Sequence, residues 1–261
     1  MVGGGRGIVF IHGMYVNGIS WDPWLRLATD RGYTAHAPSW PCHEGEPAYL
    51  REYLDPALGR LTFGEVVTHL VAMIRGLPAR PVLVGHSIGG LLVQRLVAMG
   101  LARAGVAISP APPQGIFSLD PNFLRANLPH INPLAGNRPV FMNRARFHYA
   151  FANTLDRAAS DAAFDAYVVP ESRNVPRSTL GAAAKIDFTA PHVPLFFIAG
   201  DRDHLTPMPM VQRNMRAYGA AGGVVDYRGF TGRSHFICNE PGWQEVAAAA
   251  LDWIDTRVPS G

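Results

Sequence analysis

The stretch that decides the fold reads Val82-Leu83-Val84-Gly85-His86-Ser87-Ile88-Gly89-Gly90. A short apolar run ends in Gly-x-Ser-x-Gly, and apolar residues at helical spacing follow at once. This order predicts a strand, a sharp turn and a helix. Gly85 and Gly89 have no Cβ atoms to collide across such a turn, which lifts the Ser87 hydroxyl clear of the sheet edge. Ser87 is therefore a candidate nucleophile at a helix N-terminus, where free N–H groups favour developing negative charge.

Length and composition limit the class of protein. A chain of 261 residues that is 48% hydrophobic can bury a full core. The formal net charge is +3, but Lys and Arg are scattered singly, so we expect no nucleic-acid partner. Cys42 and Cys238 fit neither a disulfide framework nor a zinc site, and we expect reduced thiols. Because no apolar run has the length of a signal peptide or a membrane span, we expect a cytoplasmic monomer or homodimer with no membrane partner.

Strand and helix patterns alternate on both sides of the Ser87 turn. One expected helix starts with Asp22 as its N-cap and Pro23 in its first position, and another starts with a capping box formed by Thr62 and Glu65. The last helix is expected over 243–257. Repeated strand-helix alternation predicts a mostly parallel, doubly wound α/β sheet. The further runs that read as strands are 8–11, 33–37, 105–108, 193–199 and 224–230.

The alternation breaks between the fourth and fifth strands. Residues 111–192 begin with many prolines and continue with helical patterns over 144–155 and 160–168, without a convincing buried strand. A structureless connection of that length is uncommon in a compact domain. We therefore expect a core formed by 1–110 and 193–261, with 111–192 as a helical cap, or lid, over the sheet edge.

Three chemically complementary side chains follow strand ends: Ser87, an aspartate within 201–203, and His235. In an open α/β sheet, ligands bind at the carboxyl ends of the strands. A serine needs a base to activate it, histidine can take that proton, and a carboxylate orients the imidazole and stabilises its charged form. Position alone does not decide between Asp201 and Asp203, since both follow the same strand.

Together these residues resemble the α/β-hydrolase superfamily, in its serine-nucleophile branch. The motifs that carry the resemblance are His12-Gly13, Gly85-His86-Ser87-Ile88-Gly89-Gly90, Gly200-x-x-Asp203-x-x-x-Pro207 and Ser234-His235-Phe236. The resemblance covers the chain from Ile8 to Trp253 apart from the cap. It implies a catalytic triad of Ser87, Asp203 and His235, because the spacing of the family's acid loop matches Asp203.

The resemblance also implies an oxyanion hole formed by the backbone N–H groups of Met14 and Ile88. Too little sequence precedes Ser87 for the two N-terminal strands of the larger family members. We therefore expect about six strands, as in the compact plant methylesterase and hydroxynitrile lyase branch. The loop after the second strand lacks the family's frequent Asp-x-x-Gly-x-Gly run.

The expected reaction is hydrolysis of an ester, thioester or lactone of a small, largely apolar substrate, with no cofactor and no metal. We expect Trp40, Phe147 and Phe151 to contact that substrate. A carbon-carbon hydrolase, a lyase or a perhydrolase can share the same residues, since fold and triad do not fix the reaction. A ligand receptor that keeps the fold without turnover is the alternative outside enzymes.

Overall fold

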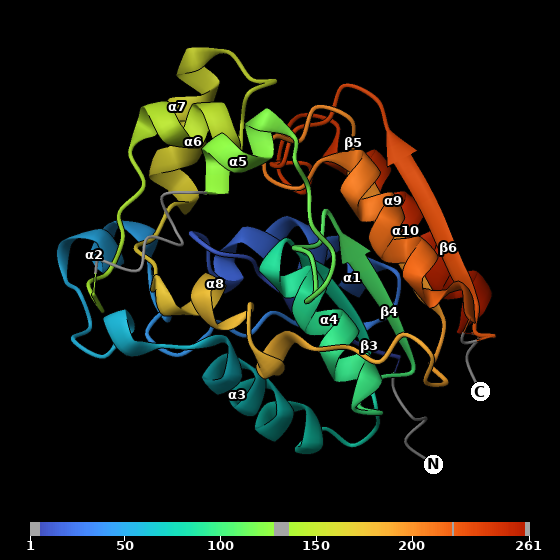
Figure 1. The fold of residues 1–261 in the computed structure, drawn as a ribbon. Coiled ribbons are helices and arrows are strands. Elements are labelled where there is room, and N and C mark those ends of the chain that lie inside the picture. The colour runs from blue at the N-terminus through green and yellow to red at the C-terminus, as the bar shows by residue number, and fades with distance from the viewer. Residues whose placement is uncertain (1–5, 128–135, 221, 259–261) are drawn as a thin grey trace.

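The computed structural model describes residues 6–127, 136–220 and 222–258. Within them, six strands form one sheet in the order β2-β1-β3-β4-β5-β6, and every neighbouring pair is parallel (Figure 1). The expected sheet of about six strands is therefore confirmed. The strands are β1 (Gly7–Ile11), β2 (Thr34–His36), β3 (Val82–His86), β4 (Ala104–Ile108), β5 (Leu195–Gly200) and β6 (Val225–Phe230).

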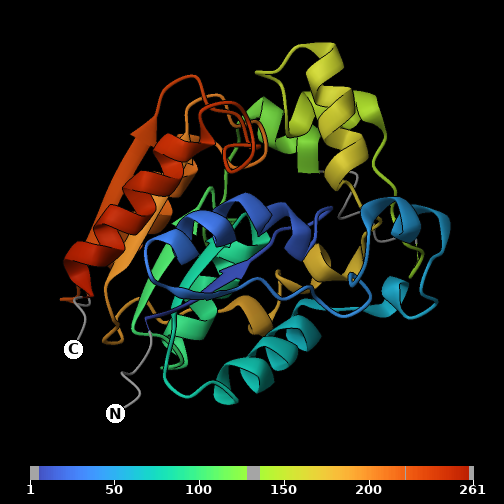
Figure 2. The ribbon, with the colours of Figure 1, turned by 180° about the vertical axis from the view of Figure 1, so that it is seen from behind.

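Helices cover both faces of this sheet, and strand residues alternate between the two cores. In β1, Val9 and Ile11 pack with the helices on one face, whereas Ile8 and Phe10 pack with those on the other. The first face carries α3 (Phe63–Arg75), α4 (Ile88–Ala98) and α9 (Met208–Ala217). The second face carries α1 (Asp22–Asp30) and α10 (Trp243–Arg257) (Figure 2). Burial on both faces explains why the strands read as continuous apolar runs.

Local sequence signals set most helix ends. The expected capping box is present: the Thr62 side chain accepts the Glu65 N–H, and the Glu65 carboxylate accepts the Thr62 N–H. The expectation that Asp22 caps α1 is wrong, because Asp22 is already the first helical residue. A 3-10 turn, η1 (Gly18–Trp21), runs directly into α1, and the side chain of Asn17 caps that turn instead. The remaining short elements outside the β4–β5 connection are α2 (Pro47–Glu52), η2 (Leu58–Arg60) and η6 (Tyr218–Ala220).

The connection between β4 and β5 is helical, as expected, although its helices are shorter or shifted. It contains α5 (Pro121–Asn127), α6 (Arg144–Ala150), α7 (Arg157–Tyr167), α8 (Asn174–Ser178) and η5 (Ala182–Ala184). The Asp156 side chain caps α7 before the expected start at residue 160. Figures 1 and 2 both show α5, α6 and α7 gathered beyond the carboxyl ends of the strands.

None of the helices in the described ranges combines the length and the apolar character needed to cross a bilayer.

Candidate active site

The Ser87 turn joins β3 to α4 and is held between two strands. Ser87 has φ 57° and ψ −120°, a region that residues other than glycine rarely adopt. Its N–H donates to the Ile108 carbonyl at 3.0 Å, and its own carbonyl accepts the Ala111 N–H at 2.9 Å. Such strain persists only where the surroundings enforce it, and it is typical of functional sites.

The two glycines of the motif make this turn possible through close backbone approach. A Cβ at Gly85 would lie 2.2 Å from the Gly89 carbonyl oxygen, and a Cβ at Gly89 would lie 2.1 Å from the Ile11 carbonyl oxygen. Either distance is far inside van der Waals contact. Gly85 also pairs in register with Ile11 of β1 and Ala107 of β4, so the turn sits where three carboxyl strand ends meet.

Asp203 and His235 form a buried pair in the loops after β5 and β6. Asp203 Oδ2 lies 2.7 Å from His235 Nδ1, and both side chains are fully buried. Asp203 also accepts the N–H groups of Leu205 at 2.8 Å and Thr206 at 2.7 Å, and the Thr206 hydroxyl at 2.8 Å. Burial alone raises the pKa of the Asp203 carboxyl, but His235 and the donated hydrogen bonds outweigh it, so this pKa lies below its ordinary value.

Asp201 is in a different position from Asp203. Its side chain is exposed, and its carboxylate accepts the Gly232 N–H at 2.7 Å in the loop after β6. This contact joins two turns and does not reach the imidazole. The geometry therefore brings together His235 and Asp203, and leaves Asp201 in a structural contact at the surface.

The second nitrogen of His235 has no hydrogen-bond partner among the described residues, although it is buried. In the neutral imidazole, a proton on Nδ1, facing the Asp203 carboxylate, leaves a lone pair on Nε2. That nitrogen makes no hydrogen bond to Ser87 in this structure; catalytic hydrogen bonds commonly form only once substrate is bound. The His235 carbonyl accepts the Nε2 proton of His86 at 2.8 Å, which fixes the backbone beside the imidazole.

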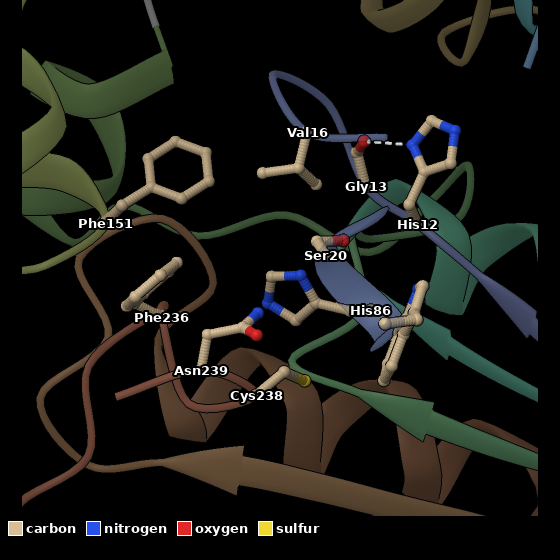
Figure 3. A pocket seen from close by; sticks show the side chains of 10 residues that line it. His12, Gly13, Val16, Ser20, His86, Phe151, Phe236, Cys238 and Asn239 are labelled. Atoms are coloured by element: carbon tan, nitrogen blue, oxygen red, sulfur yellow. Dashed lines mark hydrogen bonds between the residues drawn. The ribbon is translucent and has the colours of Figure 1, made fainter. Parts of the chain in front are cut away.

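A small cavity lies beside His86 (Figure 3). Its volume is about 10 Å³, and Phe151 and Phe236 lie on the opposite side of it from His12. Burial, together with the neighbouring His235, lowers the pKa of His86 to about 3, so this ring is neutral. His12 is neutral as well, because burial and His43 keep its pKa well below the ordinary value.

Two backbone N–H groups beside Ser87 have no acceptor within the described part of the chain. They belong to Met14, in the turn after β1, and to Ile88, the first residue of α4. Both residues line the same cavity as Ser87. Unpaired N–H groups that face a site together are suited to stabilise an oxygen that gains negative charge.

The cavity at Ser87 continues into a larger apolar one. The first has a volume of about 70 Å³, and the second a volume of about 320 Å³. No charged side chain of the described residues lines either cavity. The residues that line both are Ile88, Ala111, Pro112, Asn127 and Pro176.

The aromatic residues expected to contact substrate divide into two groups. Phe151 lines the Ser87 cavity and packs its ring 5.0 Å from that of His235. Trp40 and Phe147 line neither cavity, which corrects the expectation for both. Trp40 is fully buried and stacks on His12, with ring centroids 4.4 Å apart. Phe147 is fully buried against Phe151, so its ring serves packing.

The structure places at the site several residues to which the sequence patterns assign no role. Thr206 supports Asp203, and the pattern Asp-x-x-Thr, typical of a loop in which the aspartate accepts following N–H groups, could have indicated it. Glu171 and His43 contact one another below the Met14 turn from distant loops, and no local pattern connects them. In the described ranges, no three His, Cys, Asp or Glu side chains are grouped so that they could hold a metal ion.

Comparison with known proteins gives one family and many similar folds. The family model described as "Alpha/beta hydrolase family" matches residues 8–249. A search of the curated proteins finds no match. Among solved structures, a monoacylglycerol lipase of Paleococcus ferrophilus is 18% identical with a TM-score of 0.72, and the alignment covers 98% of this chain and 96% of that one.

Two further solved structures have the same fold with different printed activities. Tomato methylketone synthase I complexed with 2-tridecanone is 14% identical with a TM-score of 0.71, covering 97% of this chain and 99% of that one. A pyrethroid hydrolase from Sphingobium faniae JZ-2 is 18% identical with a TM-score of 0.67, covering 97% and 98%. At these identities the likeness shows the fold alone.

Proposed function

The chain belongs to the alpha/beta hydrolase family, and from this premise we propose that it cleaves an ester, thioester or lactone through a serine-bound acyl intermediate. The observation that carries the proposal is the Ser87 cavity. A strained serine lines it together with two residues whose N–H groups are unpaired, and the buried Asp203–His235 pair lies beside it.

In the proposed reaction, Ser87 Oγ attacks the substrate carbonyl carbon while His235 Nε2 takes the hydroxyl proton. The carbonyl oxygen becomes an oxyanion, which the N–H groups of Met14 and Ile88 stabilise. When the bond to the leaving group breaks, the alcohol or thiol takes the proton from His235. Water then repeats the sequence on the acyl group, releases the acid and restores Ser87. Asp203 keeps the imidazole in one tautomer and stabilises its positive charge.

The proposed substrate is small and largely apolar. The cavities of about 70 and 320 Å³ have room for a short reacting group and a longer hydrocarbon part, and uncharged residues line both. Much of this lining comes from the connection between β4 and β5. We therefore propose that 111–192 acts as a cap that shapes the substrate pocket over a core of 1–110 and 193–261.

Turnover of p-nitrophenyl esters tests the proposal. We expect the purified protein to release many equivalents of p-nitrophenol from acetate to octanoate esters. Ser87→Ala should reduce kcat on the order of 10³-fold or more. Ser160→Ala, at a buried serine in α7, is the matched control that should keep the parent rate. Thermal stabilisation by esters without turnover would contradict a hydrolase and support a receptor.

A further inference from the structure

A buried carboxylate from the β4–β5 connection lies directly under the turn that carries Met14. Glu171 is fully buried, and its Oε2 accepts the Tyr15 N–H at 3.3 Å. Its other oxygen, Oε1, accepts the N–H of Ser172 at 2.7 Å. The backbone of Glu171 is fixed by a pair of hydrogen bonds with Val140, at 2.7 and 3.0 Å. The Glu171 carboxylate is therefore oriented by its own segment and binds the backbone of Tyr15 in the turn after β1.

Tyr15 needs such support because its backbone conformation is unfavourable. Its φ of 65° lies in the left-handed region, which a bulky side chain rarely adopts. The same segment also holds the other side of this residue, since the Val169 N–H donates to the Tyr15 carbonyl at 2.9 Å. The Met14–Tyr15 peptide is thus fixed from outside its own loop. The Met14 N–H belongs to the preceding peptide, which meets this one at the Met14 Cα, so a shift of the Met14–Tyr15 peptide would move the Met14 backbone that lines the cavity with Ser87.

His43 completes the arrangement from the loop after β2. Its Nε2 lies 3.3 Å from Glu171 Oε2, and both side chains are fully buried. Because the Pro41 carbonyl at 3.0 Å accepts the Nδ1 proton, a proton between Nε2 and Glu171 leaves the pair without net charge. Burial lowers the pKa of His43, but Glu171, the Pro41 carbonyl and Glu44 together outweigh it, so the net shift is upward. An unpaired carboxylate here would oppose the negative charge that develops at the oxyanion.

We propose that Glu171, paired with His43, is a positioning residue for the oxyanion hole. It acts through the Tyr15 peptide, it ties the cap segment to the Met14 donor, and its partner cancels its charge. The inference rests on the proposed function, because it assigns a role relative to the Met14 N–H in that reaction. In this role Glu171 affects the stabilisation of the transition state and not the binding of substrate.

Two substitutions at Glu171 and one matched control test this role. Glu171→Ala removes the acceptor of the Tyr15 N–H, and we expect kcat on p-nitrophenyl butyrate to fall about 10- to 100-fold, since loss of one oxyanion donor costs about 10²–10³. KM should change by less than about threefold. The rate of phosphonylation by a fluorophosphonate should fall in parallel with kcat, because that reaction also places negative charge on an oxygen. Glu171→Gln keeps an acceptor oxygen and should recover a large part of kcat.

Ser172→Ala is the control for mere destabilisation. Ser172 is buried in the same segment and donates to the Leu61 carbonyl at 2.7 Å, but it makes no hydrogen bond to Tyr15. We expect it to lower the melting temperature while kcat stays within about twofold of the parent. Hydrogen exchange at the Tyr15 amide should speed up in Glu171→Ala and stay slow in Ser172→Ala.

The outcomes separate the inference from the proposed function. If the parent shows no turnover, the proposed function fails, and the Tyr15 exchange rates still report whether Glu171 holds the peptide. If the parent is active and folded Glu171 variants keep kcat within twofold, the positioning role is wrong. The same holds if Ser172→Ala loses as much kcat as Glu171→Ala. Should Glu171→Ala not fold, Glu171→Leu, which also lacks the acceptor but fills more of the space, carries the test, and an unchanged kcat together with an unchanged phosphonylation rate overturns the inference.

Discussion

The two sides of the candidate site are held in place by different means. On the acid side, the partners of Asp203 besides His235 lie two and three residues further along the same loop. On the oxyanion side, the Tyr15 peptide after Met14 is held by Glu171, 156 positions later in the chain. Apart from His235, the Asp203 carboxylate is thus held within its own loop, whereas the Tyr15 N–H is held by a carboxylate from the β4–β5 connection.

This difference has a functional consequence. The β4–β5 connection also contacts the acid loop, where Asn153 donates to the Arg202 carbonyl at 3.0 Å and His204 Nδ1 lies 2.8 Å from the Tyr149 carbonyl, but these contacts do not involve the Asp203 carboxylate. A turn whose strained residue is held by the cap loses its geometry when the cap segment shifts. In this account, substitutions in the acid loop act on the charge of the triad, and substitutions in the cap act on the alignment of the oxyanion donor.

The largest expected effect is on the acid side. Asp203→Asn keeps the shape of the side chain but gives His235 an amide, which selects the wrong tautomer and removes the charge opposite the imidazolium. We expect kcat to fall by up to about 10⁴-fold, measured on the purified variant after circular dichroism confirms folding. Asp201→Asn is the matched control, with near-normal kcat and a loss of about 1 kcal/mol in stability from its Gly232 contact. An inactive Asp201→Asn beside an active Asp203→Asn would exchange the two roles.

A smaller effect should appear in the pH dependence of stability, with opposite direction on the two sides. The lowered pKa of Asp203 contributes stability that is present above about pH 3.8, its ordinary pKa, and lost as the pH falls through the folded value. The raised pKa of His43 contributes stability that is present below about pH 6.5 and lost as the pH rises through its folded value. Glu171 and Glu44 favour charged His43, while His12 is neutral beside it.

Thermal unfolding between pH 3 and pH 9 measures both contributions. The difference in melting temperature between the parent and Glu171→Gln should shrink as the pH rises, and the difference between the parent and Asp203→Asn should shrink as the pH falls. Ser172→Ala should show a difference that varies little with pH, since it removes no titrating pair. Two differences that change in the same direction would contradict the assignment of charge to the two sides.

The contrast between the sides also explains what the sequence could predict. The strands, the Ser87 turn and the Thr62 capping box follow from neighbouring residues, and the structure has them where the patterns indicated. The prediction of Asp22 as the N-cap of α1 is wrong because the preceding 3-10 turn, η1, continues directly into that helix.

The remaining errors concern contacts between distant segments. Trp40 and Phe147 carry aromatic rings at the right edge of the sheet, but whether a ring lines a cavity or fills the core depends on partners far away in the sequence. His43 and Glu171 are separated by 128 positions and share no motif. No local pattern in a single sequence indicates such a pair, because the fold alone brings the two residues together.

Covalent labelling tests the central claim, that Ser87 is the nucleophile, most directly. The parent protein is treated with a fluorophosphonate, digested and analysed by mass spectrometry alongside Ser87→Ala. We predict a single phosphonyl adduct on the peptide that contains Ser87, formed as esterase activity disappears, and no adduct in the variant. An adduct on Ser234, or full inhibition without any adduct at Ser87, would contradict the account.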